Sequence, residues 1–284
     1  MSDRLEPGWT GVLGWPLSQT LSPAIHRAAF EHHGLVWSYQ AWPVEPTHLA
    51  KAVEGLRILG ASGANVTMPH KASVGRFLDG LRGDAEILRA VNTIVPTDGG
   101  LYGYNTDAGG FKKFLTEDAG FDASGEHAVV LGAGGAARAV VKALTDLGVS
   151  AISIAARKPL QAAIVAELAA PADATVLRWE QASGAARGAA IVVNATPVGA
   201  DGEEVLDGDR LNDSQVVVDL LYGIDTPLLQ AARAAGAGAF DGLGMLVRQA
   251  AASFALWTDL DPPVEEMRAA AVAQIHKKPV EGLS

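Results

Sequence analysis

The stretch that decides the fold is VVLGAGGAAR, at residues 129–138. It begins as a short apolar run, turns at glycines, and continues into a helix-like pattern over residues 139–144. Strand, tight turn and helix in this order are the context that the dinucleotide fingerprint G-x-G-x-x-G/A requires. Gly132 can adopt the unusual dihedral angles of the turn, Gly134 lets a pyrophosphate approach the backbone, and Ala137 lets the helix lie close to the strand. We expect phosphate binding at this helix N-terminus; an ordinary strand-to-helix turn is the alternative.

The composition indicates a globular protein with an acidic surface. Of 284 residues, 49% are hydrophobic, the formal net charge is −10, and no cysteine is present. This length allows one large domain or two ordinary ones. The negative charge argues against nucleic acid or an anionic membrane as the main partner, and the lack of cysteine excludes disulfides and thiol catalysis. Because no signal segment and no apolar run of membrane-spanning length is recognised, we expect a cytoplasmic protein.

Strand-like and helix-like segments alternate along the chain, which predicts α/β architecture. After the fingerprint, nearly continuous apolar runs are typical of parallel strands covered on both faces; they lie at residues 151–156, 189–196 and 216–220. Shorter strand-like runs precede the fingerprint, and the last two of them are expected to pair around a turn at residues 98–100; these runs lie at residues 9–14, 38–44, 63–68, 91–95 and 101–105.

The order of these segments predicts two domains. Residues 109–242 are expected to form a Rossmann dinucleotide-binding domain, and residues 1–108 an open α/β substrate-binding and catalytic domain. Residues 243–284 carry two helix-like segments, at about 244–257 and 263–275. We recognise no strand of the second sheet's type before these helices, and therefore expect them to return to the first domain.

The residues after the second strand of the nucleotide unit favour NADP. Ala156-Arg157-Lys158 stands about two dozen residues after Gly132, where an NAD site has an acidic residue for the ribose and an NADP site an Arg for the 2′-phosphate. A solvated pair of cations at a helix start is the alternative, although cations oppose the dipole at a helix N-terminus.

Two polar motifs offer acid–base chemistry. Asn65-Val66-Thr67 with Lys71 follows a strand, at the edge where open α/β sheets bind ligands, and Asn105-Thr106-Asp107 adds a carboxylate. A Lys near an Asp can deliver or accept a proton while the Asp holds it in place. Each polar residue alone could instead form a turn or cap a helix, as we expect of Ser22 before Pro23. The histidines lack ligand spacing, so no metal site is predicted.

Short motifs, in order along nearly the whole chain, resemble the shikimate dehydrogenase family. Those of the first half are Gly14-x-Pro16, Thr20-x-Ser22-Pro23-x-x-His26, Asn65-Val66-Thr67-x-Pro69-x-Lys71, Ala90-Val91-Asn92-Thr93 and Asn105-Thr106-Asp107-x-x-Gly110. Those of the second half are Gly132-Ala133-Gly134-Gly135-Ala136-Ala137-Arg138, Asn194-Ala195-Thr196-Pro197-x-Gly199, Thr226-Pro227-Leu228-Leu229 and Asp241-Gly242-x-x-Met245-Leu246-x-x-Gln249.

The resemblance implies NADP(H)-dependent, reversible reduction of 3-dehydroshikimate to shikimate, a step of aromatic amino acid (chorismate) biosynthesis. It implies a catalytic pair, Lys71 and Asp107, and no metal. Substrate-binding residues would be Thr20, Ser22, Asn65, Thr67, Asn92, Tyr222 and Gln249. Cofactor-binding residues would be Gly132, Ala133, Gly134, Gly135, Ala136, Ala156, Arg157, Lys158, Asn194, Thr196, Pro197, Leu220, Gly242 and Met245.

The chain departs from the family pattern at several positions. Thr20 replaces a Ser in the carboxylate pocket, and Ala156-Arg157-Lys158 replaces Asn-Arg-Thr. Ala72 stands where a Glu usually follows the catalytic Lys, and Arg89 replaces a Gly. Two alternatives therefore stay open: a quinate/shikimate or aminoshikimate dehydrogenase of the same fold, and a nucleotide-binding relative without catalysis. The expected assembly is a monomer or a homodimer.

Overall fold

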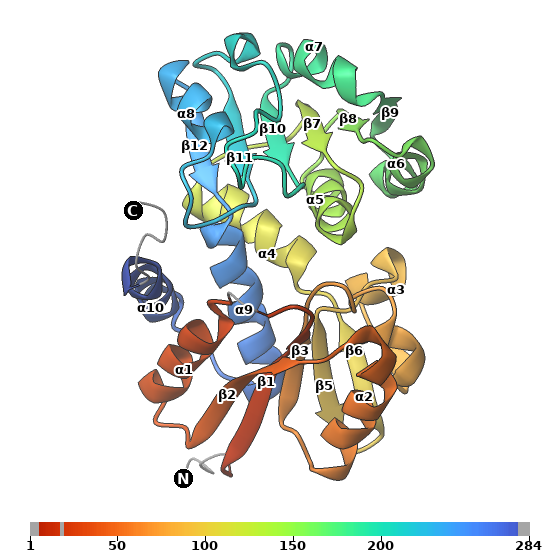
Figure 1. The fold of residues 1–284 in the computed structure, drawn as a ribbon, viewed down its shortest axis with the longest axis vertical. Coiled ribbons are helices and arrows are strands. Elements are labelled where there is room, and N and C mark those ends of the chain that lie inside the picture. The colour runs from red at the N-terminus through yellow and green to blue at the C-terminus, as the bar shows by residue number, and fades with distance from the viewer. Residues whose placement is uncertain (1–5, 18–19, 278–284) are drawn as a thin grey trace. The chain divides into compact units, whose positions relative to one another are not determined.

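The computed structural model describes residues 6–17 and 20–277. The chain forms two compact units, residues 1–106 with 247–284 and residues 107–246, shown from red to blue along the chain in Figure 1. The first boundary lies at Asp107 because helix α4 begins there, and the second lies beyond Met245 because that side chain is buried in the second unit's core. Both differ by a few residues from the boundaries expected at 108 and 243. The terminal residues 1–5 and 278–284 of the expected ranges lie outside the described residues.

The second unit is built on six parallel strands in the order β12-β11-β10-β7-β8-β9. Their bounds are β7 (His127–Leu131), β8 (Ala151–Ala155), β9 (Asp173–Leu177), β10 (Ile191–Asn194), β11 (Val216–Asp219) and β12 (Gly238–Asp241). The strand order reverses between β7 and β10, which are hydrogen-bonded neighbours. This is the doubly wound Rossmann order, whose ligands bind beyond the carboxyl ends of the strands at the reversal point. The predicted fold class is confirmed.

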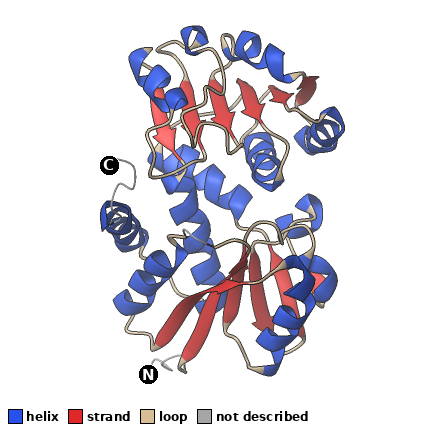
Figure 2. Cartoon of the chain, viewed as in Figure 1, coloured by secondary structure: helices blue, strands red, loops and turns tan. Residues whose placement is uncertain are grey.

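Alternating side chains of these strands feed two separate hydrophobic clusters. Ala128 and Val130 of β7 pack with helix α5, whereas Val129 and Leu131 pack on the other face with α7 and α8. Helices therefore cover both faces of the sheet, as Figure 2 shows, which explains why its strands are almost wholly apolar. The helical segments are α4 (Asp107–Lys113), the π-helical η3 (Phe114–Asp118), α5 (Gly135–Asp146), α6 (Pro159–Ala166), η4 (Glu167–Ala169), η5 (Trp179–Gln181), α7 (Ala182–Ala186), η6 (Gly208–Arg210) and α8 (Pro227–Ala234).

The first unit is built on a mixed sheet in the order β2-β1-β3-β5-β6-β4. Its strands are β1 (Gly8–Gly14), β2 (Trp37–Pro43), β3 (Gly63–Val66), β4 (Gly80–Leu81), β5 (Thr93–Thr97) and β6 (Gly100–Tyr104). Strands β1, β2 and β3 run parallel, and β5 is antiparallel to both β3 and β6. The β5–β6 pair closes from Thr97 to Gly100, which confirms the strand pair predicted around residues 98–100.

The C-terminal helices pack in this first unit. The ring centres of Phe254 in α9 and Phe30 in α1 lie 5.9 Å apart. The Trp257 indole donates a hydrogen bond to the Ile94 carbonyl at 3.0 Å. Glu266 of α10 meets His32 of α1 at 3.1 Å. The helical segments of this unit are α1 (Ser22–His32), η1 (Pro46–His48), α2 (Leu49–Ile58), η2 (Val74–Phe77), α3 (Asp84–Leu88), α9 (Leu243–Thr258) and α10 (Val264–Lys277). No helix within the described residues is long and apolar enough to cross a membrane.

Two local expectations were wrong. Strand β12 (Gly238–Asp241), which pairs with β11 in the second sheet, does precede α9. It is an edge strand of four half-buried residues, so it lacks the continuous apolar run by which the other strands were recognised. Ser22 does not cap α1: it is the first helical residue, Leu21 holds the cap position, and the Ser22 amide donates to Thr20 Oγ1 at 3.3 Å.

Candidate active site

A buried polar network lies in the first unit, centred on Asn65 of β3. The Asn65 amide nitrogen lies within hydrogen-bond distance of the Asn92 carbonyl (3.1 Å), Thr93 Oγ1 (3.3 Å) and Ser253 Oγ (3.0 Å). Its carbonyl oxygen accepts a hydrogen bond from the Tyr39 hydroxyl at 2.7 Å. Because buried amides are costly unless they are bonded, this arrangement fixes the orientation of the Asn65 side chain.

Asn92 joins the same network to two other segments of the chain. The side-chain oxygen Oδ1 of Asn92 accepts a hydrogen bond from the Thr106 backbone amide at 2.8 Å. The side-chain nitrogen Nδ2 of Asn92 donates a hydrogen bond to Gln249 Oε1 at 3.2 Å. Asn92 is 2% exposed and Thr106 is 6% exposed. The structure therefore brings together Asn65, Asn92 and Gln249, three of the residues that the resemblance assigns to the substrate.

Three members of the network were missed by the sequence reasoning: Tyr39, Thr93 and Ser253. Ser253 lies one helical turn after Gln249 on α9, donates to the Gln249 carbonyl at 3.1 Å and meets Thr93 Oγ1 at 2.7 Å. The signal for Ser253 was its i, i+4 spacing from Gln249 on an otherwise apolar helix face. Tyr39 gave no such signal, because an aromatic residue in a strand is ordinary core.

Lys71 and Asp107 are positioned from neighbouring backbone segments. The carbonyl of Lys71 accepts from the Val91 amide at 2.8 Å, and the Asn105 side chain donates to the Ala90 carbonyl at 3.0 Å. The turn that carries Lys71 and the strand end that leads to Asp107 are thus hydrogen-bonded to two consecutive residues, Val91 and Ala90. Asp107, 4% exposed, opens α4, where a carboxylate is favoured by the helix dipole.

The other substrate-binding candidates are more dispersed. Burial raises the pKa of the Tyr39 phenol, and a hydrogen bond with Ser22 offsets part of this rise, so Ser22 reaches the edge of the polar network. Thr67 follows β3, and its amide donates to the Leu13 carbonyl at 2.9 Å. Tyr222 lies in the second unit after β11, where burial raises the pKa of its phenol.

The glycine turn after β7 has the geometry of a phosphate site. Gly132 has φ +110°, and a Cβ there would lie 2.9 Å from both the Ala195 carbonyl and Thr196 Cγ2, so the fold itself requires glycine. At Gly134 and Gly135 a Cβ would meet no protein atom within 4 Å. Gly134 is the N-cap of α5 and has no side-chain cap bond. Open space above unbonded helix amides fits a pyrophosphate, so the turn fits a dinucleotide.

The end of β10 lies beside this turn and is held rigidly. Asn194 is fully buried; its carbonyl oxygen accepts from the amide and hydroxyl of Thr196 at 3.0 and 2.7 Å, and its nitrogen donates to Asp219 Oδ1 at 3.0 Å. Burial raises the pKa of the Asp219 carboxyl, although hydrogen bonds from the Leu221 amide, Thr226 and Asn194 lower it in part. These contacts fix the loop that contains Thr196 and Pro197.

Leu220 and Gly242 lie together beyond β11 and β12. The Leu220 amide donates to the Asn194 carbonyl and the Gly242 amide to the Leu221 carbonyl, both at 2.9 Å. A Cβ at Gly242 would overlap the Leu220 backbone, so glycine is required there for packing. Met245 is 8% exposed and belongs to the core.

Arg157 lies exposed after β8. Its guanidinium lies 5.5 Å from the centre of the Trp179 ring and 4.0 Å from Glu203 Oε1. Ala156 is buried, and Lys158 is the N-cap of α6. An exposed cation supported by an aromatic ring is suited to an anionic ligand. Trp179 was not predicted as part of this site.

No group of side chains with the makings of a metal site occurs among the residues that the structure describes. A Rossmann sheet whose first strand-to-helix turn leaves space for a pyrophosphate, together with a separate α/β unit that holds a buried polar network, is typical of dinucleotide-dependent enzymes.

Comparison with known proteins identifies the family. Three family models match consecutive parts of the chain: the shikimate dehydrogenase substrate binding domain (residues 12–94), shikimate / quinate 5-dehydrogenase (115–219) and the shikimate 5′-dehydrogenase C-terminal domain (242–272). The shikimate dehydrogenase (NADP⁺) of Methanothermobacter thermautotrophicus is 40% identical over 266 residues, which cover 91% of this chain and 93% of that one. The chain belongs to the shikimate dehydrogenase family.

Two solved structures extend the comparison. Shikimate 5-dehydrogenase from Thermus thermophilus, in complex with NADP(H) and shikimate, is 36% identical with a TM-score of 0.85 and covers 94% of this chain and 99% of its own. Quinate dehydrogenase from Corynebacterium glutamicum, in complex with NAD, is 31% identical with a TM-score of 0.87. This match covers 94% of the present chain and 99% of the Corynebacterium chain.

The two glycines of the turn should respond differently to substitution. Gly132→Ala should destabilise the fold by about 1–3 kcal/mol, because its φ and the Ala195 carbonyl leave no room for a Cβ. Gly134→Ala should cost less than about 1 kcal/mol, yet weaken NADP binding about tenfold or more. Denaturant unfolding and calorimetric titration measure the two effects. Unchanged NADP affinity in Gly134→Ala would contradict a phosphate role for this turn.

His26 should make stability depend on pH. Its ring stacks 4.5 Å from that of Tyr39, and burial lowers its pKa to about 3, although the neighbouring Asn65 side chain offsets a smaller part of this shift. The unfolded chain, with a pKa near 6.5, therefore binds the extra proton between these values, and the free energy of unfolding falls as pH drops below 6.5.

Comparison with His26→Phe isolates this effect. For each pH unit below 6.5, the free energy of unfolding of the wild type should fall by about 1 kcal/mol more than that of the variant. Urea unfolding at several pH values measures this difference. Parallel pH profiles for the two proteins would show that His26 is not held neutral.

Proposed function

We propose that this protein is an NADP-dependent shikimate dehydrogenase, which reversibly reduces 3-dehydroshikimate to shikimate in aromatic amino acid biosynthesis. The observation that carries the proposal is that Lys71 and Asp107 are both present, on backbone segments tied to the polar network of Asn65 and Asn92. The curated relative from Methanothermobacter and the ligands of the Thermus structure support the substrate and the cofactor.

In this proposal most of the residues that bind and protonate the substrate belong to the first unit, whereas Asp107 and Tyr222 belong to the second. The Lys71 ammonium donates a proton to the oxygen of the ring ketone, and the Asp107 carboxylate orients the ammonium and shares its proton. Thr20 and Ser22 bind the substrate carboxylate. The carboxylate and the hydroxyl groups of the substrate are surrounded by Asn65, Thr67, Asn92, Gln249 and Tyr222. Since the amides of Asn65 and Asn92 are already fixed by protein hydrogen bonds, little ordering is left to be done when the substrate binds.

The second unit, in the same proposal, holds the cofactor, whose nicotinamide ring supplies or takes up the hydride when bound. The turn Gly132-Ala133-Gly134-Gly135-Ala136 binds the pyrophosphate through amides at the start of α5. Arg157 and Lys158, after Ala156, bind the 2′-phosphate. Asn194, Thr196, Pro197, Leu220, Gly242 and Met245 form the nicotinamide side, in which Asn194 and Gly242 act by holding the backbone.

Quinate/shikimate dehydrogenase is the second candidate, supported by the likeness to the NAD-bound quinate enzyme of Corynebacterium. It is favoured if NAD supports the reaction better than NADP does. Absorbance assays with NADPH and NADH against shikimate, quinate and aminoshikimate, run in the oxidative and reductive directions, separate these activities. We propose further that the enzyme acts in the cytoplasm as a monomer or homodimer; its net charge of −10 supports small molecules rather than nucleic acid as partners.

Removing the proposed proton donor should lower turnover. Lys71→Ala should reduce kcat by roughly 10²- to 10⁴-fold with little change in substrate affinity, because the ammonium acts mainly in the transition state. Steady-state kinetics measure both parameters. Lys51→Ala, an exposed Lys on α2, is the matched control and should behave as wild type. Near-normal turnover in Lys71→Ala would refute the acid–base role.

Removing the proposed 2′-phosphate ligand should change cofactor choice. Arg157→Ala should raise KM for NADP by about 10- to 100-fold and leave KM for NAD nearly unchanged, since only NADP carries the phosphate. Arg187→Ala, an exposed Arg in the same unit, controls for the loss of one charge. Equal effects on the two cofactors would remove the assignment of Arg157.

A further inference from the structure

Two side chains that the family resemblance does not assign to the cofactor, Trp179 and Glu203, meet the Arg157 guanidinium. The guanidinium carbon lies 5.5 Å from the centre of the Trp179 ring, and Nη2 lies 4.0 Å from Glu203 Oε1. The Arg157 side chain nevertheless remains 65% exposed and that of Glu203 60% exposed. The guanidinium is therefore in contact with both partners and still accessible to a ligand from solvent.

The register of the second sheet brings Trp179 beside Arg157. Strands β8 and β9 are parallel neighbours in which Ala155 lies opposite Leu177. Arg157 and Trp179 each follow these partners by two residues, so both leave the sheet at the same carboxyl edge. The Trp179 side chain is half-buried and packs against the hydrophobic cluster on the α7 and α8 face of the sheet. The ring is thus fixed by the core and serves as a support for the cation.

The loop that carries Glu203 is anchored on the same cluster. Val205 and Leu206, two and three residues after Glu203, are 5% and 8% exposed and belong to that cluster. The aromatic ring and the carboxylate that meet Arg157 come from different segments, after β9 and after β10, yet both segments pack on one hydrophobic cluster. Their positions relative to Arg157 are therefore set by the core of the second unit.

The two contacts have opposite consequences for an anionic ligand. An aromatic face attracts a guanidinium and restricts a long side chain that is otherwise costly to order, so a phosphate meets a cation that is already in place. The Glu203 carboxylate instead neutralises part of the charge of Arg157 and repels a second anion. An exposed ion pair at 4.0 Å is weak, so a phosphate dianion can displace the carboxylate, but with less gain than at a free guanidinium.

We propose that Trp179 and Glu203 set the preference for NADP over NAD in opposite directions. Trp179 is a positioning residue that holds Arg157 for the 2′-phosphate, and Glu203 is an anion that competes with this phosphate for Arg157. The inference rests on the proposed function, in which Arg157 binds the 2′-phosphate. NAD has no phosphate at this position, so changes at Trp179 and Glu203 should alter its affinity much less than that of NADP.

Calorimetric titration with NADP⁺ and with NAD⁺, in the absence of substrate, measures this preference as the ratio of two dissociation constants. Trp179→Leu keeps an apolar side chain on the cluster but removes the aromatic face, and should lower the preference for NADP about three- to fivefold. Trp179→Phe should keep most of it. Melting temperatures of the variants show whether the fold is retained.

The carboxylate is tested by a matched pair of variants. Glu203→Gln should raise the preference for NADP about two- to fivefold, because it removes the competing charge and keeps the shape of the side chain. Glu204→Gln removes the same charge from the next residue, which is also exposed, and should leave the preference unchanged.

The same substitutions in the Arg157→Ala background test whether both residues act through Arg157. Without the guanidinium, Trp179→Leu and Glu203→Gln should no longer change the ratio of the two dissociation constants, as a double-mutant cycle requires of coupled residues. An effect on the ratio that persists without Arg157 overturns the inference.

The remaining outcomes separate this inference from the proposed function. Equal affinity of the wild type for NADP⁺ and NAD⁺ contradicts NADP dependence itself, and the inference falls with it. A wild-type preference for NADP⁺ that stays the same in Trp179→Leu and in Glu203→Gln overturns the inference and leaves the proposed function standing. Equal weakening of both dinucleotides in Trp179→Leu shows that the ring does not act on the 2′-phosphate, and overturns the role of Trp179.

Discussion

The side chain of Asn92 is the constraint on which the geometry of the first unit depends. It accepts a hydrogen bond from the Thr106 amide and donates one to Gln249, so it joins three segments that are far apart in the sequence. Because Asn92 is almost completely buried, breaking either bond would leave an unsatisfied polar group in the core. The positions of α9 and of the strand end that leads to Asp107 are thus set by the same amide. A residue that binds substrate in the proposal is therefore also one that holds the fold together.

The nucleotide unit depends on a comparable but simpler constraint. Strands β7 and β10 are neighbours at the point where strand order reverses, and the loops after them touch at Gly132 and Ala195. Gly132 is needed by the protein, because its φ and its neighbours exclude a Cβ, whereas Gly134 and Gly135 meet no protein atom that would require glycine. One turn thus contains a glycine required for folding and two glycines that the protein's own packing does not require.

The sequence predicted the parts of this structure that local patterns encode. The buried parallel strands around Val129, Ile152, Val192 and Val217 were found because both of their faces are apolar. Strand β12 was missed because a half-buried edge strand carries no such run. Asn65, Asn92 and Gln249 could be named from the family motifs, yet their mutual bonds could not, because these depend on how β3, β5 and α9 meet. Tyr39 and Ser253 were missed for the same reason: their role exists only in the tertiary fold.

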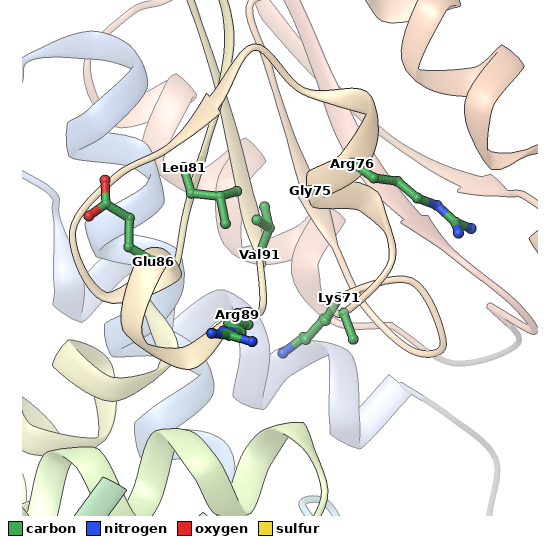
Figure 3. Close-up of a pocket in the computed structure, with 8 residues that line it drawn as sticks. Lys71, Gly75, Arg76, Leu81, Glu86, Arg89 and Val91 are labelled. Carbon is green, nitrogen blue, oxygen red and sulfur yellow. The ribbon is translucent and has the colours of Figure 1, made fainter. Parts of the chain in front are cut away.

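The tertiary fold also relates two departures from the family pattern that the sequence left unconnected. Positions 72 and 89 are distant along the chain, but both line one cavity of about 400 Å³ beside Lys71 (Figure 3). Alanine at 72 in place of a glutamate removes a negative charge, and arginine at 89 in place of a glycine adds a positive one. Both changes shift the local potential in the same direction, although the second places a residue with a Cβ at φ +49°, which costs backbone strain. Two departures that lie apart in the sequence therefore act on the charge around one cavity, a relation that only the tertiary fold shows.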